Sequence, residues 1–375
     1  MKKGRNLRSV NTDGGVNLQF KLLSAIGIII IVSGHCYHGG MELAYNWFPP
    51  YSYNLALFVF ISGYFYKTDY EENVGKYIWK RTKRLLIPAY LWNIFYGCMV
   101  AFLGLFGFTI GAKPDLYNLF VMPFVDGEAF QYNLGSWFVY PLFLVCIINV
   151  LFRKFLKLIH LDNEFIVLIV YLAIGMIGIN TALENPTAIN GIVKLLVRTM
   201  FFLPCYEFGR FYKAVLEKKD NLNNVAYFAI IFAVQLILLT FCKDLEYTPS
   251  SFTKFNNGFI IPYISSITAI AFWLRVSRLL VPAIGNSKLV RLIADNTYGI
   301  MVNQLVGFMC LKFVFYGLSL ITSGSLFGDF NVASFKSSIW YYYLPNGLQQ
   351  WAFVYLIFGL FVPILISIIL SLIHI

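Results

Sequence analysis

The first long apolar stretch, residues 20–37, reads FKLLSAIGIIIIVSGHCY. It carries one charged side chain, Lys21, and at about 1.5 Å per residue it covers most of a hydrocarbon layer about 30 Å thick. Backbone polar groups in lipid must be satisfied within the segment, so we expect an α-helix here. The basic tail before it resembles the start of a signal peptide, but no convincing small-residue cleavage site follows. We therefore interpret the stretch as a retained first helix.

Further apolar runs of similar character follow along the whole chain. They span residues 50–66, 85–107, 136–152, 165–183, 190–209, 223–242, 258–274, 292–318 and 349–373. The chain is 59% hydrophobic and 13% charged, whereas soluble domains carry about 25% charged residues. The sequence therefore predicts an all-α, polytopic membrane bundle with about ten transmembrane helices. We expect one domain over residues 1–375, with residues 1–17 as a cytoplasmic tail.

The distribution of lysine and arginine predicts the orientation. Every second connection is basic, beginning with the N-terminal tail, whereas the opposite connections hold few basic residues. Those few are Lys113, Lys243, Lys254 and Lys336. Because basic loops stay in the cytoplasm, the alternation predicts a cytoplasmic N-terminus. It also accounts for the net charge of +11 without a nucleic-acid partner. The composition is typical of a bacterial protein, and we expect it in the plasma membrane.

The cysteines and histidines give no metal or disulfide pattern. The six cysteines all fall within or at the edge of apolar runs, which is typical of small buried side chains. They are Cys36, Cys98, Cys146, Cys205, Cys242 and Cys310. His35 and His38 lie one helical turn apart, but no third ligand is evident. We therefore expect no metal site.

Ionisable side chains inside predicted helices are costly in lipid, so each is a candidate functional residue. They are Lys21, His35, Lys194, Arg198, Glu207, Asp295 and Lys312. His35 lies near the outer end of the first predicted helix. A neutral imidazole can accept a proton near neutral pH, as a general base does. The alternative is a histidine that only forms a hydrogen bond to a neighbouring helix.

Two pairs of basic residues have helical spacing. Arg81 and Arg84, in the basic cluster that opens the third predicted helix, are three residues apart and would share a helix face. Two guanidinium groups can bind phosphate, although a basic run often only anchors a helix at the membrane surface. Lys194 and Arg198 are four apart in the sixth predicted helix. They would face a wet cavity or form an ion pair, for example with Asp295 or Glu207.

Four motifs follow one another in the first 140 residues. The first predicted helix ends in His35, and the second ends in FVFISGY at residues 58–64. The third opens with RTKRLLIP at residues 81–88, and the fourth begins with SWF at residues 136–138. With this order and spacing, nearly the whole chain resembles the acyltransferase-3 family of membrane acyltransferases. It is most similar to the bacterial polysaccharide O-acetyltransferase branch of that family.

The resemblance implies transfer of an acyl group, usually acetyl from cytoplasmic acetyl-CoA, to a hydroxyl of an extracytoplasmic glycan or lipid-linked saccharide. It also implies that His35 is the general base, that Arg81 and Arg84 hold the CoA phosphates, and that Ser62 belongs to the second-helix motif. Gly63 in the same motif permits a close backbone approach. Arg198 or Tyr298 can stabilise the developing oxyanion. A covalent acyl-histidine relay is equally compatible, because imidazole is also a nucleophile.

The sequence departs from the family pattern at two positions. Many members have an arginine or lysine eleven residues before the histidine, where this chain has Ser24; Lys21, one turn earlier, can substitute for it. Many members also have a histidine in the region where this chain has Asn303 and Gln304. These differences keep two alternatives open, a saccharide transporter and a non-catalytic membrane sensor. The expected partners are acyl-CoA, the glycan acceptor and membrane lipid.

Overall fold

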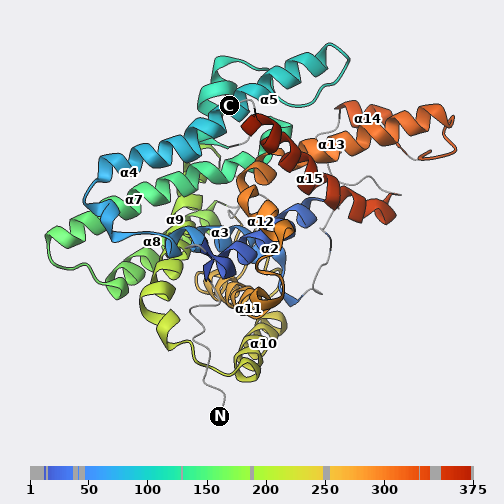
Figure 1. Ribbon diagram of the computed structural model, residues 1–375. Helices are drawn as coiled ribbons and strands as arrows, with labels where there is room; N and C mark the ends of the chain where they lie inside the picture. Colours follow the sequence, from blue (N-terminus) through green and yellow to red (C-terminus); the bar gives the residue numbers. More distant parts are fainter. Residues whose placement is uncertain are drawn as a thin grey trace.

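The computed structural model describes residues 12–13, 16–36, 41, 47–127, 130–185, 190–247, 254–328, 330–337 and 348–372, and most of them are helical (Figure 1). The predicted all-α class is confirmed, apart from a short antiparallel pair, Thr12–Asp13 (β1) with Val16–Asn17 (β2). The described α-helices are α2 Leu18–His35, α3 Asn54–Tyr64, α4 Val74–Arg81, α5 Ile87–Gly104, α6 Met122–Val125, α7 Val139–Leu158, α8 Glu164–Glu184, α9 Gly191–Phe211, α10 Asn224–Phe241, α11 Ile261–Ile284, α12 Lys288–Asp295, α13 Thr297–Ile321, α14 Val332–Ser337 and α15 Ala352–Leu372.

Short 3₁₀ and π segments extend or connect several of these helices. The 3₁₀ segments are Pro50–Ser52, Thr68–Glu71, Gln131–Phe138, Glu217–Lys219 and Gln349–Trp351. The π-helical segments are Thr82–Leu86, Tyr117–Val121 and Tyr212–Leu216. The first of these π segments lies between α4 and α5 and makes one continuous helical path from Val74 to Gly104.

Eight of the described helical stretches are long and apolar enough to cross a membrane. They are Leu18–His35, Val74–Gly104, Tyr132–Leu158, Glu164–Glu184, Asn224–Phe241, Ile261–Ile284, Thr297–Ile321 and Gln349–Leu372. The predicted run 50–66 contains α3, whose 11 residues rise only about 16 Å. The predicted run 190–209 forms α9, which has the length of a span but carries Lys194, Arg198 and Glu207. Eight helices therefore meet the length and composition of a span, and the count of ten is not confirmed.

Helix α2 lies at the centre of the bundle, with α3 beside it (Figure 1). It contacts α3, α11, α12, α13 and α15, and most of its side chains are buried. The helix begins after Asn17, whose side-chain oxygen accepts a hydrogen bond from the backbone N–H of Phe20 at 3.2 Å. It ends at His35. The central position of α2 places every residue from Lys21 to His35 within reach of several neighbouring helices.

Helices α3 and α9 cross at unusually close range because each presents a glycine. A Cβ atom at Gly63 would collide with the backbone carbonyl of Tyr206, and one at Gly209 would collide with that of Phe60. The close backbone approach expected for Gly63 is therefore confirmed. This crossing fixes the C-terminal end of the short helix α3, which carries Ser62.

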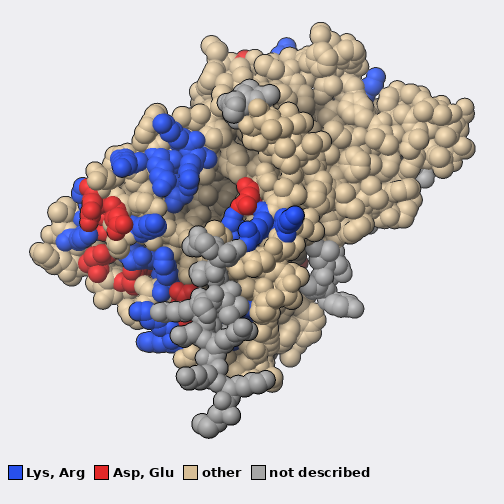
Figure 2. All heavy atoms as spheres, viewed as in Figure 1, with Lys and Arg blue, Asp and Glu red and all other residues tan. Residues whose placement is uncertain are grey.

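Basic side chains gather on one face of the molecule (Figure 2). Lysines and arginines lie on both sides of a hollow in this face, and one group of them covers α4. Lys80, Lys83 and Arg84 are exposed there. The surface to the right of the hollow shows few charged side chains, as expected for helices that face lipid.

Candidate active site

His35 and Gln304 form a direct contact between α2 and α13. The Nδ1 atom of His35 lies 3.2 Å from Oε1 of Gln304. The amide nitrogen of Gln304 donates to the backbone carbonyl of Met301 at 3.1 Å, so the amide oxygen is the atom that faces the histidine. An amide oxygen can only accept, and Nδ1 therefore carries the imidazole proton. The other ring nitrogen, Nε2, keeps its lone pair and can accept a proton from a substrate.

Two other contacts position the residues around His35 and Gln304. The Tyr51 hydroxyl donates to the carbonyl of Gly34 at 3.0 Å, and its ring stands edge-on to the His35 imidazole. On the other side, Gly135 lies against the carbonyl of Met301, where a Cβ atom would collide. The 3₁₀ segment Gln131–Phe138 can therefore come close to α13 at the level of Gln304. His38 lies outside the described residues.

Buried polar side chains support the Gln304 region from behind. The hydroxyl of Tyr96 donates to Asn303 at 2.6 Å, and the amide of Asn133 donates to that of Asn93 at 3.1 Å. Asn93 in turn donates to the backbone carbonyls of residues 118 and 119. Sequence reasoning did not single out Tyr96, Asn93 or Asn133. The available signal was an amide or hydroxyl side chain inside an otherwise apolar run.

A cavity of about 230 Å³, which we name the core cavity, lies below this corner of the site. Three of the four sequence motifs contribute to its lining, whereas His35 does not. The lining residues are Ser24, Ile28, Phe58, Ile61, Ser62, Leu85, Phe138, Val139, Leu142, Thr297, Tyr298 and Met301. Met301 lies one helical turn below Gln304 on α13, so the upper end of the core cavity approaches the His35–Gln304 contact.

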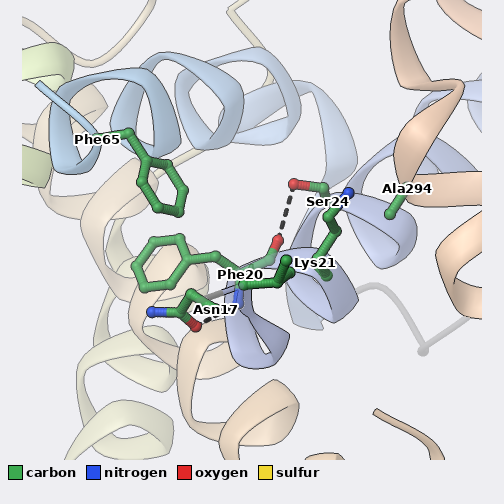
Figure 3. Close-up of a pocket in the computed structure, with 7 residues that line it drawn as sticks. Asn17, Phe20, Lys21, Ser24, Phe65 and Ala294 are labelled. Carbon is green, nitrogen blue, oxygen red and sulfur yellow. Dashed lines mark hydrogen bonds between the residues drawn. The ribbon is translucent and has the colours of Figure 1, made fainter. Parts of the chain in front are cut away.

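A second cavity of about 280 Å³, which we name the mouth cavity, lies beside the start of α2 (Figure 3). Its lining consists of Val16, Asn17, Phe20, Lys21, Ser24, Phe65 and Ala294. The rings of Phe20 and Phe65 meet edge-on on one side, and Lys21 extends toward Ala294 on the other. Lys21 forms an ion pair with Asp295 at the end of α12. Because Ser24 lines both cavities, the two spaces adjoin at this residue.

Four residues with hydroxyl groups line the core cavity, namely Ser24, Ser62, Thr297 and Tyr298. Ser24 donates to the carbonyl of Phe20 at 2.8 Å, and Ser62 donates to that of Phe58 at 2.9 Å. Each serine oxygen therefore keeps lone pairs that can accept. The hydroxyl of Tyr298 is buried and has no hydrogen-bond partner among the described residues. Such a group is costly unless a ligand or water completes it.

Arg81 and Arg84 differ in burial and in contacts. Arg81 donates through Nε to the hydroxyl of Tyr77 at 3.0 Å and lies over that ring, so it is half-buried. Arg84 is exposed. The segment that begins at Thr82 is π-helical, and the regular three-residue spacing assumed for one α-helical face does not apply there. Leu85, the next residue, lines the core cavity.

Lys194 and Arg198 belong to a different polar cluster, near the start of α9. Lys194 pairs with the carboxylate of Asp126 at 3.2 Å, and Arg198 donates to the backbone carbonyl of Asp126 at 3.1 Å. The guanidinium of Arg198 also lies 4.3 Å from the ring centre of Trp137. The suggested partners Asp295 and Glu207 are wrong, because Asp295 pairs with Lys21 and Glu207 pairs elsewhere.

Glu207 belongs to a buried ion network between α7, α8 and α9. Both of its carboxylate oxygens accept from Arg153, at 2.9 and 2.7 Å. Arg153 also bonds to Glu164, which accepts from Arg210 at 3.0 Å. Arg153 and Glu207 are 1% and 0% exposed, so the network joins three helices in a setting that excludes water. We attribute a structural role to it.

The remaining candidates lie apart from the site. Lys312 is buried in α13, with its ammonium group 5.9 Å from the ring centre of Tyr355. All six cysteines are free, but only Cys36, Cys146 and Cys205 are buried as expected, whereas Cys98 is exposed and the other two are half-buried. No group of three potential metal ligands occurs among the residues that the structure describes.

Comparison with known proteins identifies a family. The model of the acyltransferase-3 family, described as an acyltransferase domain, matches residues 17–372. The matched range includes α2, the core cavity, the His35–Gln304 contact and all of the mouth-cavity lining except Val16. No curated protein and no solved structure matches the chain.

Proposed function

The chain belongs to the acyltransferase-3 family, and from this premise we propose that it transfers acetyl from acetyl-CoA to a hydroxyl of an extracytoplasmic glycan. The family and the eight long apolar helices make it a multi-pass membrane protein. The observation that supports the reaction most directly is the His35–Gln304 contact, one turn above a cavity lined by the family motifs. We further propose the plasma membrane, with the basic face of Figure 2 toward the cytoplasm.

The donor is proposed to enter from the basic face. Arg84 and Lys83 are exposed and can attract the CoA phosphates. Arg81 instead donates a hydrogen bond to Tyr77 and is proposed to hold that ring in place. Lys21 also lines the mouth cavity, although Asp295 balances its charge there. A positive entrance of this kind raises the local concentration of an anionic substrate.

His35 is proposed to be the general base. Its Nε2 atom takes the proton of the acceptor hydroxyl while the hydroxyl oxygen attacks the thioester carbonyl carbon. The carbon–sulfur bond then breaks, and the CoA thiolate leaves and takes up the proton from the imidazole. The products are an O-acyl glycan and CoA with a free thiol. A positioned base of this kind contributes about 10²–10⁴ in rate.

The two oxyanion candidates are proposed to have other roles. Tyr298 lies six residues before Gln304 on α13, which is about 9 Å along the helix, so it is better placed to contact the donor arm than the reacting carbon. Trp137 belongs to the 3₁₀ segment that touches Met301 through Gly135, and Arg198 lies over its ring. We assign them to the acceptor side, where an aromatic ring and a guanidinium group suit a sugar. Acylation of His35 itself remains an alternative route with the same residues.

The test is ester-linked acetate on the surface glycans of cells. We would compare cells with the wild-type chain, a deletion and His35→Ala, with equal membrane levels of the two proteins. Loss of ester in both the deletion and His35→Ala supports a transferase that uses His35. His160→Asn, at an exposed histidine outside the site, is the matched control and should behave as wild type. Unchanged ester in all cells would refute the proposal and favour a transporter or a sensor.

A further inference from the structure

We infer that the mouth cavity and the core cavity together bind the pantetheine arm of the acyl donor, through the hydroxyl groups of Ser24, Ser62 and Tyr298. Pantetheine is a linear chain with two amide groups and one hydroxyl. Tyr298 donates to an amide carbonyl, and the two serine oxygens accept from amide N–H or hydroxyl groups. This inference rests on the proposed function, since it assumes that the donor is a CoA thioester.

The hydrogen-bonding inventory of the core cavity fits such a chain. Ser24 and Ser62 have already used their protons on carbonyls of their own helices, so toward the cavity they can only accept. The Tyr298 hydroxyl has no partner among the described residues and can donate. Thr297 adds a fourth hydroxyl to the lining, and the remaining side chains are apolar, as at Ile28 and Phe58. A ligand with a few spaced amides in a methylene chain therefore satisfies this lining better than a fully polar or fully apolar ligand.

The dimensions also agree. Three bonds of an extended chain span about 3.3–3.6 Å, so the roughly thirteen bonds from the phosphorus to the sulfur of the arm reach about 15 Å. Ser24 lies eleven residues before His35, which is about 16 Å along α2. The two amides lie about 4 and 8 Å from the sulfur on the same scale, and Tyr298 is about 9 Å below Gln304. A thioester at His35 therefore leaves the phosphate end near Ser24 and Lys21.

The small size of Ser24 matters because this residue lines both cavities. Its side chain ends at a hydroxyl that folds back on its own helix, so it occupies little of the junction. Lys21, one turn earlier, lines the mouth cavity and is held in place there by the ion pair with Asp295. The arm can thus pass Ser24 while its phosphate end remains beside a lysine. A larger apolar residue at this position should obstruct the arm.

The experiment measures binding by the purified full-length protein in lipid nanodiscs. The probes are acetyl-CoA and 3′-phospho-ADP, which is the nucleotide part of CoA without the arm. The variants are Ser62→Ala, Tyr298→Phe and Ser24→Leu, and the control is Thr240→Val. Thr240 makes the same kind of bond to its own helix, to the carbonyl of Leu236, on an exposed part of α10. Thermal unfolding confirms that each variant is folded.

We expect Ser62→Ala and Tyr298→Phe each to raise the Kd of acetyl-CoA about 3- to 10-fold, the effect of one lost neutral hydrogen bond. Ser24→Leu should raise it further, and 3′-phospho-ADP should bind to all variants as to wild type. If the wild type binds acetyl-CoA but Ser62→Ala and Tyr298→Phe bind it equally well, the pantetheine site is wrong and the proposed function stands. The site is also wrong if both probes weaken together. If the wild type does not bind acetyl-CoA, the proposed function fails and the site fails with it.

Discussion

The imidazole of His35 and the side-chain amide of Gln304 face each other across α2 and α13, with 3.2 Å between Nδ1 and Oε1. The side-chain N–H of Gln304 donates to the carbonyl of Met301, so the atom that faces His35 is the amide oxygen, which can only accept. It selects the imidazole tautomer whose free nitrogen, Nε2, can accept a proton. Unlike a carboxylate, glutamine brings no charge to stabilise an imidazolium. The proposed base is thus oriented by a neutral partner.

Substitution of Gln304 should separate orientation of the base from binding of the donor. Gln304→Leu removes the acceptor, and we expect kcat to fall about 10- to 100-fold because the imidazole loses its fixed tautomer and position. The KM for acetyl-CoA should not change. Gln304→Glu keeps an oxygen acceptor and should restore kcat to within about tenfold of wild type. The measurement is transfer of labelled acetyl to glycan in membranes, and a fully active Gln304→Leu protein would contradict the role.

Arg84 and Arg81 should have distinct effects although both belong to one basic motif. Arg84 is exposed, and we expect Arg84→Ala to weaken CoA binding about tenfold, as for a lost bond to a charged group. Arg81→Ala should instead reduce the thermal stability, because Arg81 covers and bonds to Tyr77. Binding of CoA and thermal unfolding are measured for both. Lys154→Ala, at another exposed basic position, controls for the loss of charge.

The crossing of α3 and α9 should not tolerate a methyl group. In Gly63→Ala the new Cβ atom would meet the carbonyl of Tyr206, and we expect a loss of about 1–3 kcal/mol in the free energy of unfolding. Gly75→Ala is the matched control, because a Cβ atom there meets nothing within 4 Å. Thermal unfolding in detergent compares the two proteins. Equal stability would show that the two helices can separate without cost.

The buried network at Arg153 should be essential for folding. Glu207→Ala leaves part of a buried guanidinium charge without its partner, and we expect a loss of about 3–5 kcal/mol in the free energy of unfolding. Glu72→Ala, at an exposed carboxylate, should change it little. The amount of folded protein in membranes and its thermal unfolding are the readouts. A stable Glu207→Ala protein would indicate that Glu164 and Asp162 can balance Arg153 without it.

Much of the helical architecture could be predicted from the sequence because apolar length in lipid dictates helices directly. The run that begins at residue 20 became α2 with nearly the expected bounds, and its histidine ends the helix. Helix α3 is shorter than its apolar run, since Pro50–Ser52 forms a separate 3₁₀ turn before it. The count of spans depended on such details, and hydrophobicity alone does not reveal them.

The site depended on partners that are distant in the sequence. Gln304 was noted only as a departure from a family pattern, because its contact with His35 joins residues 269 positions apart. The partner of Lys194 is Asp126, which follows a short helix in a connecting segment and lies outside any span. The π-helical segment after Arg81 also has no clear signature in its residues. Tertiary packing therefore determined these three features.

The apolar lining between Ser24 and the His35–Gln304 contact has a consequence for the energy balance of the cell. The proposed function requires a passage that admits a donor from one side and an acceptor from the other. Such a passage must not let ions leak across, because a leak would lower the membrane potential. Side chains such as Ile28, Phe58 and Phe138 cannot replace the hydration shell of an ion, so entry of an ion is costly. Narrow apolar constrictions also expel water when no ligand is present. The uncharged histidine–glutamine contact above them offers no fixed charge to a passing cation. The proposed transfer of a small acyl group is thus compatible with a membrane that remains an electrical insulator.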